Sequence, residues 1–481
     1  MPPKSEPRVV GGRGEGRGTV IRRLLFLLLA VALGAVAAAA LPGRIRPLAL
    51  SALATRGAAW TSLDVDGAPP RRSQYGMAAD TAGNVYVYGG SGEGGVALGD
   101  SWVLRPGDRT WREIANAVVP PLIEAHLATD AAGNVYELGG IGSAAGGHFS
   151  YDGHSYGLYE YSPASGAWSD LTPPNITPGV GWPLGREDFG FAGDPLTGQL
   201  YVFAGEGPTD APLNDLWAYD LASHRWSEVG QRYSAPGGAT IDPREIYNIS
   251  YDYHGGFFLF GGSYLFAAKG AAEPPLYAND LWHFDGATQT WTLLGGRANG
   301  YDPTMPLPRH YFGQSCDQDG NFYLLDGYVS DPTVPPYFGG GMQAAHVRAV
   351  GFDGKDGSAS GAYAIADFWR YTAGLGNWQD LTNTLGDLAA KPAIPYAMVT
   401  DLYGGQLVTF GGWHPMGGTL RQSSSSWSYP LLARPGPRPA GPWLASVGGA
   451  TPSAVRVTVS PTAAVLTQRV VRSAASPTPV R

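Results

Sequence analysis

Apolar positions along this chain fall into short runs that alternate with glycine, proline and polar residues. Six of these runs end on a pair of small residues, namely YVYGG (86–90), YELGG (136–140), YVFAG (201–205), FLFGG (258–262), YLLDG (323–327) and VTFGG (408–412). A short apolar run that stops where glycine permits a positive φ is typical of a buried β-strand. The pattern therefore predicts six repeats, each built around one such strand.

Two polar residues recur at fixed distances before these runs. An aspartate stands nine or ten residues before each small pair, at Asp80, Asp130, Asp194, Asp252, Asp317 and Asp401. In four repeats an arginine lies eight residues before that aspartate, at Arg72, Arg186, Arg244 and Arg309. The corresponding residues of repeats two and six are Leu122 and Ala393, so the arginine is not universal.

A second pair of strands follows each small pair after a loop of variable length. An aromatic residue and a tryptophan lie nine residues apart in five repeats, at Trp102 and Trp111, Tyr159 and Trp168, Trp217 and Trp226, Trp282 and Trp291, and Trp369 and Trp378. This constant spacing beside variable loops predicts a hairpin in which both aromatic rings pack inside one sheet.

The sixth repeat lacks its last strand. Trp427 lies in the third strand, but the residue nine positions later is Gly436, inside the segment ARPGPRP. A matching segment stands at the other end of the repeats, at Trp60–Leu63. We expect this N-terminal strand to complete the last sheet and close a ring, which leaves few free sheet edges.

The small pairs, the aromatic strands and the tryptophan spacing resemble the kelch repeat, from about residue 60 to residue 430. This resemblance implies an all-β, six-bladed β-propeller with four-stranded antiparallel blades around a central channel. The expected blades span about 71–114, 122–171, 185–229, 243–294, 308–381, and 393–429 completed by 60–63.

Charge divides the chain into three parts. Residues 58–430 carry 17 basic and 38 acidic residues, whereas both ends are basic. An acidic central domain argues against nucleic-acid binding, since phosphate affinity depends on lysine and arginine. Residues 431–481, rich in Pro, Ser, Thr and Ala and without acidic residues, are expected to be a disordered tail.

The composition of the N-terminus predicts a targeting signal. Residues 24–41 form an uncharged apolar run after a basic leader, residues 1–23, and before a linker, residues 42–58. Two interpretations remain open, a cleaved secretory signal and an uncleaved signal anchor with a single membrane span. Either places the propeller outside the cytoplasm, as a secreted or membrane-anchored protein.

Binding by a propeller is expected at the loops of one face and at the channel mouth. The longest of these loops are Tyr328–Ala366, Ser263–Ala278 and Ile141–His154. The four repeated arginines suggest an anion clamp at the mouth. Their alternative role is structural, in ion pairs with neighbouring carboxylates such as Glu187, Asp188 or Glu245. The binding-face candidates are Arg72, Arg186, Glu187, Arg244, Arg309 and His310.

Catalysis is the alternative function. Galactose-oxidase-like copper enzymes share the kelch architecture, but Cys316 is the only cysteine and has no matching Tyr-His pair beside it. A mutarotase-like sugar enzyme needs only a few channel residues, for which Arg186, Glu187 and His310 are candidates. The nine histidines show no metal-ligand spacing, so neither a metal nor another cofactor is expected. The favoured hypothesis is a monomeric, non-catalytic module that binds a protein or a glycan.

Overall fold

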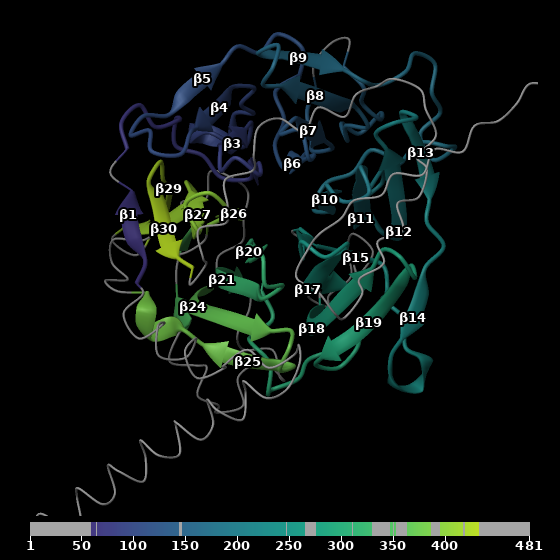
Figure 1. Ribbon diagram of the computed structural model, residues 1–481, viewed down its shortest axis with the longest axis vertical. Coiled ribbons are helices and arrows are strands. Elements are labelled where there is room, and N and C mark those ends of the chain that lie inside the picture. Colours follow the sequence, from purple (N-terminus) through teal and green to yellow (C-terminus); the bar gives the residue numbers. More distant parts are fainter. Residues whose placement is uncertain are drawn as a thin grey trace, which may run out of the picture. The chain divides into compact units, whose positions relative to one another are not determined.

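The computed structural model describes residues 59–63, 65–143, 147–246, 248–264, 276–309, 311–329, 347–349, 351–352, 363–385, 395–416 and 419–431. These residues all belong to one compact unit. Six blades surround a central axis, which confirms the predicted all-β, six-bladed propeller (Figure 1). The predicted leader, apolar segment and linker, and the tail beyond Leu431, lie outside the described residues. Within the described part, no helix is both long enough and apolar enough to cross a membrane.

The first three blades each contain four antiparallel strands in chain order. Blade 1 consists of β2 (Gly76–Ala79), β3 (Val85–Tyr88), β4 (Ser101–Leu104) and β5 (Arg112–Ile114). Blade 2 consists of β6 (His126–Thr129), β7 (Val135–Leu138), β8 (Leu158–Ser162) and β9 (Ala167–Asp170). Blade 3 consists of β10 (Gly190–Asp194), β11 (Gln199–Gly207), β12 (Ala211–Asp220) and β13 (Arg225–Glu228).

The next two blades add strands to this plan. Blade 4 consists of β14 (Arg232–Ser234), β15 (Arg244–Glu245), β16 (Ser250–Tyr251), β17 (Gly256–Tyr264), β18 (Leu276–Asp285) and β19 (Thr290–Gly295). Blade 5 consists of β20 (Gly313–Cys316), β21 (Phe322–Val329), β22 (Val347–Ala349), β24 (Tyr363–Thr372) and β25 (Asn377–Asp380). A separate small sheet contains β23 (Gly351–Phe352), β28 (Trp413–Met416) and β29 (Thr419–Gln422). The described residues also contain the short 3₁₀ turns η2 (Glu93–Gly95), η3 (Pro236–Gly238) and η5 (Thr382–Thr384).

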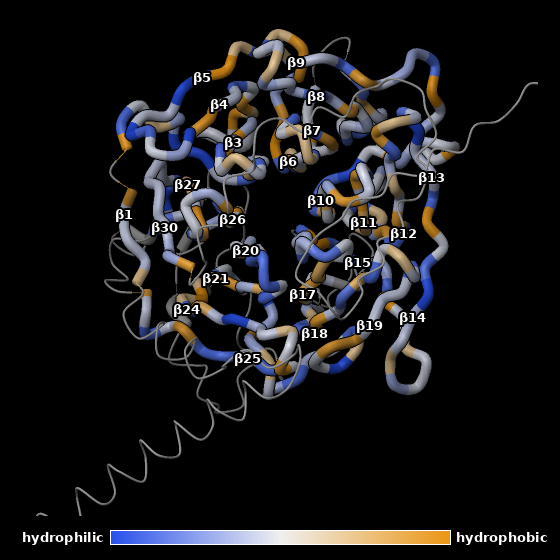
Figure 2. Tube along the Cα trace, in the orientation of Figure 1, coloured by the Kyte–Doolittle hydropathy of each residue, from blue (hydrophilic) through white to orange (hydrophobic). Residues whose placement is uncertain are grey.

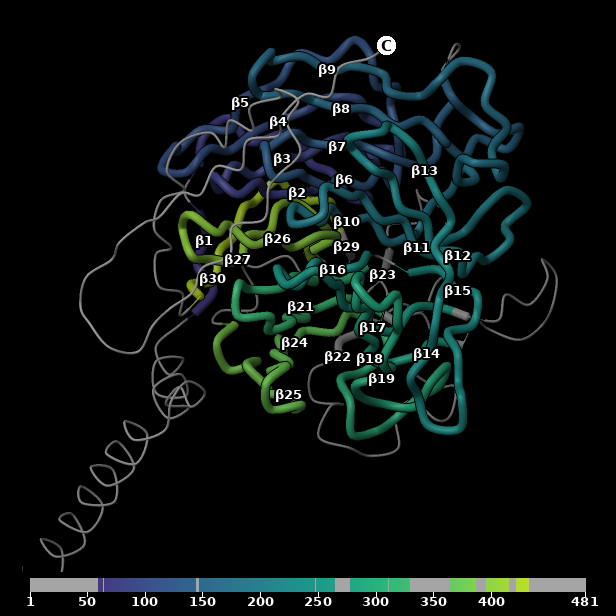
Figure 3. The backbone as a smooth tube through the Cα atoms, turned by 45° about the vertical axis from the view of Figure 1, so that its right-hand side comes forward, coloured from purple at the N-terminus to yellow at the C-terminus, as the bar shows by residue number. Residues whose placement is uncertain are grey.

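Blade 6 joins the two ends of the propeller. It consists of β26 (Met398–Asp401), β27 (Gln406–Phe410), β30 (Ser426–Pro430) and the N-terminal strand β1 (Thr61–Leu63). Thr61 pairs with Ser428 and Leu63 pairs with Ser426, as the predicted closure requires. Figures 1 and 3 both show β1 beside β30. The innermost strands then follow one another around the axis as β2, β6, β10, β16, β20, β26 and again β2.

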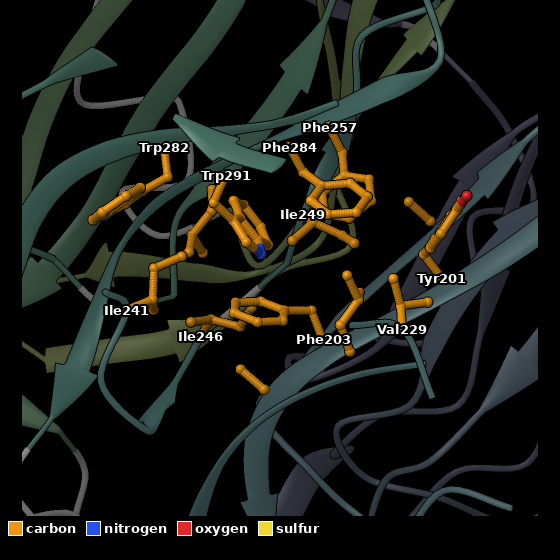
Figure 4. Packing of buried hydrophobic residues seen from close by; sticks show 14 of the residues in the cluster. Tyr201, Phe203, Val229, Ile241, Ile246, Ile249, Phe257, Trp282, Phe284 and Trp291 are labelled. Atoms are coloured by element: carbon orange, nitrogen blue, oxygen red, sulfur yellow. The ribbon is translucent and has the colours of Figure 1, made fainter. Parts of the chain in front are cut away.

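Apolar contacts between blades form the core. The described residues contain six buried clusters, and each cluster joins two neighbouring blades. Hydrophobic segments accordingly occur in every blade (Figure 2). Between blades 3 and 4, the ring of Phe203 lies 4.7 Å from that of Trp291, as measured between centroids (Figure 4). The tryptophans predicted to pack are buried here, since Trp291 and Trp282 are completely inaccessible to solvent.

The small pairs mark a sharp bend at the end of each second strand. Both residues of every pair have positive φ, but the second has the larger values, up to 119° at Gly327. The first residue has φ near +60°, where Ala204 and Asp326 are tolerated in place of glycine. At the second position of blade 1, a Cβ on Gly90 would lie 2.5 Å from the carbonyl oxygen of Ser73. Only glycine fits the second position for this reason.

The repeated aspartates shape the turn between the first two strands. The Asp80 carboxylate accepts hydrogen bonds from the backbone N–H groups of Ala82 and Asn84, both at 2.9 Å. Asp317 accepts the same two bonds from Asp319 and Asn321 in blade 5. This Asx turn needs a short side-chain acceptor at its first residue, which explains why aspartate recurs there.

Loss of the ring closure is expected to destabilise the whole propeller. The Trp60 side chain is 4% exposed and packs against Phe368 at 5.5 Å and Tyr429 at 5.6 Å. Trp60→Ala should lower the free energy of unfolding by about 3–5 kcal/mol, because it leaves a cavity between blades 5 and 6. Thr61→Ala is the matched control at the next residue, since Thr61 is exposed. Thermal and urea denaturation measure both variants. Equal stability of the two variants, or an unchanged melting curve after deletion of residues 58–66, would contradict this role.

One buried carboxyl makes stability depend on pH. Glu137 on β7 is 0% exposed, neither of its carboxyl oxygens has a hydrogen-bond partner among the described residues, and burial raises its pKa well above 4.5. Because the pKa of Glu137 is higher in the folded than in the unfolded protein, its contribution to the free energy of unfolding is fully present below the unfolded pKa. This contribution is lost as the pH rises through the folded pKa. Glu137→Gln should therefore melt higher than the parent at pH 8, with a difference that shrinks as the pH falls towards 4.5. Glu113→Gln, at an exposed residue of β5, should show no such trend. A pH-independent difference for Glu137→Gln would refute the assignment.

Candidate functional site

The four repeated arginines lie inside the propeller, at the entrances of the first strands. Arg72, Arg186, Arg244 and Arg309 are at most 1% exposed. The guanidinium group of Arg186 donates to both carboxylate oxygens of Asp215, at 2.7 and 2.8 Å. It also donates to the carbonyl oxygens of Ala204 at 2.9 Å and Leu184 at 3.1 Å. The other three arginines repeat these contacts, with Asp100, Asp280 and Asp367 as their carboxylate partners.

Three of the aspartate partners lie in β12, β18 and β24, and Asp100 directly precedes β4. Asp215 also accepts a hydrogen bond from the indole N–H of Trp217, at 2.6 Å. Burial by itself raises the pKa of Asp215, but Arg186 and Trp217 outweigh burial and hold this pKa below its ordinary value. The sequence motif Asn-Asp-Leu-Trp thus contains the acceptor that sequence reasoning missed, because that reasoning assigned the arginines to Glu187, Asp188 or Glu245. The contacts favour the structural role of the arginines over the anion clamp, since each guanidinium already binds a carboxylate.

Two residues beyond the arginine position, the chain bends toward the axis. Gln74, Glu124, Asp188 and Tyr311 occupy equivalent places in blades 1, 2, 3 and 5, and all four have left-handed φ values between 42° and 59°. Such backbone strain in non-glycine residues is frequent at functional sites. The repeated strain marks this end of the channel, the mouth, as a candidate functional site.

Side chains from opposite blades meet at the mouth. The hydroxyl groups of Tyr311 and Tyr396 each donate to the carboxylate of Glu124, at 3.3 Å, and the Gln74 amide donates to the same carboxylate. Glu124 belongs to blade 2 and Tyr311 to blade 5. Two other blades lie between them in either direction around the ring. Their contact therefore crosses the axis of the propeller.

Five carboxylates gather around this contact, and we call them the mouth cluster: Glu124, Glu187, Asp188, Glu206 and Glu245. Burial raises the pKa of Glu124, and Glu187 raises it further. Burial likewise raises the pKa of Asp188, with added repulsion from Glu124 and Glu245. The pKa of Glu245 is raised by burial and by its contact with Glu206. None of the ion pairs between described residues joins the mouth cluster to a lysine or an arginine.

Tyrosine rings lie beside these carboxylates. The rings of Tyr311 and Tyr396 stack with their centroids 4.5 Å apart, and Tyr328 lies 5.3 Å from Tyr311. All three side chains are half-buried, so part of each remains accessible. Carboxylates together with the faces of aromatic rings are groups that attract cations.

The channel below the mouth is narrow. Its cavity has a volume of about 120 Å³ and is lined by the inner strands of all six blades. Ligand pockets for small molecules typically measure about 300–1,000 Å³. This cavity therefore has room for a few water molecules and not for a larger ligand.

The remaining sequence-predicted site residues are only partly brought together. Glu187 belongs to the mouth cluster, whereas the neighbouring Arg186 points its guanidinium to Asp215. His310 lies outside the described residues, so the three acid–base candidates are not seen as one group. Glu124 was missed by sequence reasoning, because its repeat carries Leu122 in place of the arginine that drew attention to the other repeats.

The arginine–aspartate pairs are expected to support folding. Arg309→Met should lower the free energy of unfolding by about 3–5 kcal/mol, because it leaves the buried Asp367 carboxylate without its partner. Adding Asp367→Leu to the same chain should restore most of the loss, since a buried ion pair can often be replaced by apolar residues. Urea denaturation of the two variants measures both effects. Unchanged stability in Arg309→Met or in the Arg186 and Arg309 double variant, with loss of ligand binding, would instead support the anion clamp.

Comparison with known protein families identifies the repeat. The kelch motif matches residues 194–231, which run from Asp194 at the end of β10 through β11 and β12 to the residues after β13. The same strand plan recurs in six blades around the axis. Together, the motif match and this six-bladed arrangement support the assignment of the chain to the kelch-repeat propeller family.

Proposed function

We propose that this propeller is a binding module whose mouth cluster receives basic side chains of a partner protein. Kelch propellers commonly act as protein-binding modules. The observation that carries the proposal is the group of five carboxylates without a lysine or arginine partner among the described residues. Like charges in a poorly solvated site repel one another, and an incoming cation relieves that repulsion.

The mouth offers two kinds of contact to a lysine or arginine side chain. Carboxylate oxygens accept charge-assisted hydrogen bonds from ammonium and guanidinium groups. The accessible tyrosines, Tyr311, Tyr328 and Tyr396, supply ring faces for cation–π contacts. The acidic central region, residues 58–430, also attracts a basic partner before contact and raises the association rate at low salt.

The raised pKa values give the proposed binding a pH dependence. Protonation of Glu124, Asp188 or Glu245 removes the charge that a basic side chain recognises, and these carboxyls keep their protons to a higher pH than ordinary ones. Affinity for a basic peptide should therefore increase as the pH rises above about 4.5, and binding should release protons.

We also propose that the binding occurs outside the cytoplasm. The basic leader and apolar run of residues 1–41 support export of the propeller, either as a secreted protein or on a single membrane anchor. N-terminal sequencing of the mature protein tests the two routes. A start near Leu41 indicates cleavage, an intact leader in the membrane fraction indicates an anchor, and an intact leader in the soluble cytoplasmic fraction contradicts export.

Variants of the mouth cluster test the binding proposal. Asp188→Asn keeps the left-handed backbone, which asparagine tolerates, and removes one charge. Glu245→Gln keeps a hydrogen-bond acceptor for the Ser263 hydroxyl. Each should weaken the binding of a lysine- and arginine-rich peptide about tenfold, as isothermal titration calorimetry at two salt concentrations measures.

The control for these variants is Asp108→Asn, because Asp108 lies in an exposed ion pair with Arg112 between β4 and β5. It should leave the affinity unchanged. Equal binding of basic and neutral peptides, or unchanged affinity in both mouth variants, would overturn the proposal. Selective binding on a glycan array that the mouth variants abolish would instead indicate a carbohydrate ligand, and turnover of a bound sugar would indicate an enzyme.

A further inference from the structure

A buried histidine faces two glutamates at the edge of the mouth, between blades 2 and 3. His154 is 3% exposed, and its Nε2 atom makes no hydrogen bond to any described residue. Oε1 of Glu187 lies 3.5 Å from this nitrogen. Ligand atoms of His154, Glu187 and Glu206 all lie within 4.8 Å of one another. A buried ring nitrogen that has carboxylates nearby and makes no hydrogen bond needs a structural explanation.

The surrounding chain holds these three residues in place. Glu187 and Glu206 exchange two backbone hydrogen bonds, at 2.9 and 2.8 Å, so that their side chains leave neighbouring points of blade 3. His154 is fixed through its other ring nitrogen, Nδ1, which lies 3.0 Å from Oδ1 of Asp152. Asp152 in turn accepts hydrogen bonds from the Ser150 hydroxyl at 2.5 Å and from the backbone N–H of Thr209 at 2.7 Å.

The contact with Asp152 sets the chemistry of His154. A carboxylate at Nδ1 places the proton of a neutral imidazole there and leaves the lone pair of Nε2 directed at Glu187. Histidines that bind metals show this arrangement, with a carboxylate on the nitrogen that does not touch the ion. The distance of 3.5 Å between Nε2 of His154 and Oε1 of Glu187 also fits. Two ligands of a tetrahedral Zn²⁺ ion lie about 3.4 Å apart when each bond is about 2.0–2.1 Å long.

We propose that His154, Glu187 and Glu206 bind one divalent transition-metal ion, for which Zn²⁺ is the best-suited probe. One imidazole and two carboxylates suit Zn²⁺ or a related ion, whereas Ca²⁺ and Mg²⁺ prefer oxygen ligands alone. Three protein ligands leave a further coordination position for water or for a group of a partner. Glu187 and Glu206 are half-buried, so the site is open on that side. The site shares Glu187 and Glu206 with the mouth cluster, but the binding of a metal ion does not depend on the proposed peptide binding and is tested with Zn²⁺ alone.

The competing explanation is a simple ion pair. Burial lowers the pKa of His154, but the Glu187 and Asp152 carboxylates outweigh burial and raise it to about 9 when no metal is bound. A protonated His154 would then pair with Glu187 and leave no lone pair for a metal. The two explanations differ in whether Zn²⁺ binds, which makes them separable by titration.

Titration of the full-length chain, first treated with a chelator, tests the site with Zn²⁺ alone. We expect one tight equivalent of Zn²⁺ by isothermal titration calorimetry, a higher melting temperature with Zn²⁺, and little response to Mg²⁺ or Ca²⁺. Co²⁺ in the same site should give the visible absorption of a four-coordinate ion. His154→Gln and Glu206→Gln should each weaken Zn²⁺ binding at least 100-fold.

Two further variants separate a built site from general attraction to acidic groups. Asp152→Asn touches no ligand atom of the site, but it should weaken Zn²⁺ binding about 10–100-fold, because Asp152 orients the His154 ring. Asp188→Asn removes a neighbouring charge of the mouth cluster and should change Zn²⁺ affinity only a few fold. Absence of tight binding in the parent chain, or equal loss in Asp188→Asn and Asp152→Asn, overturns the proposal. If His154→Gln does not fold, Glu206→Gln and Asp152→Asn decide the question.

Discussion

The packing of each blade against its two neighbours is the constraint on which this structure depends. A four-stranded sheet with apolar residues on both faces must cover both, and only a closed ring gives every blade two partners. The six clusters between blades provide this cover, and the cluster between blades 5 and 6 includes Trp60, which directly precedes the strand β1 that completes blade 6. Trp60 therefore belongs to the core of a blade that begins more than 300 residues later along the chain.

Closure also determines what the channel mouth can be. The first strands converge on the axis, and the segments before them must bend where the blades come together. Buried arginine–aspartate pairs fix these segments in four blades, from Arg72 in blade 1 to Arg309 in blade 5. With the backbone held in this way, Gln74 and Asp188 can keep strained φ values, whereas Glu124 keeps its strained φ in a blade that carries Leu122 in place of the arginine.

Peptide binding and metal binding are both proposed from the same electrostatic property, the crowding of buried carboxylates at the mouth. Carboxylates that are removed from water and crowded together retain protons or attract cations. The Glu124 side of the cluster, with its tyrosines, suits the charged end of a long side chain. The Glu187 and Glu206 side, with His154, supplies the nitrogen and oxygen ligands that suit a metal ion. The two subsites adjoin within the mouth cluster and influence each other, since Glu187 raises the pKa of Glu124 and Glu206 raises the pKa of Glu245.

The sequence by itself determined the repeats, the closure by Trp60–Leu63 and the packing role of the spaced aromatic residues, and the structure confirms all three. These features depend on contacts within one hairpin or on a pattern that repeats six times, so regular spacing reveals them. The sequence suggested that the arginines form ion pairs but did not identify their partners. Asp215 and Arg186 are separated in the sequence by a loop whose length varies between repeats, so no fixed spacing connects them. The mouth cluster and the histidine site were decided by tertiary structure alone. Glu124 contacts Tyr311 across the axis, and His154 lies near Glu206 of the neighbouring blade. Residue spacing along the chain does not reveal these contacts, because the packing of the blades around the axis creates them.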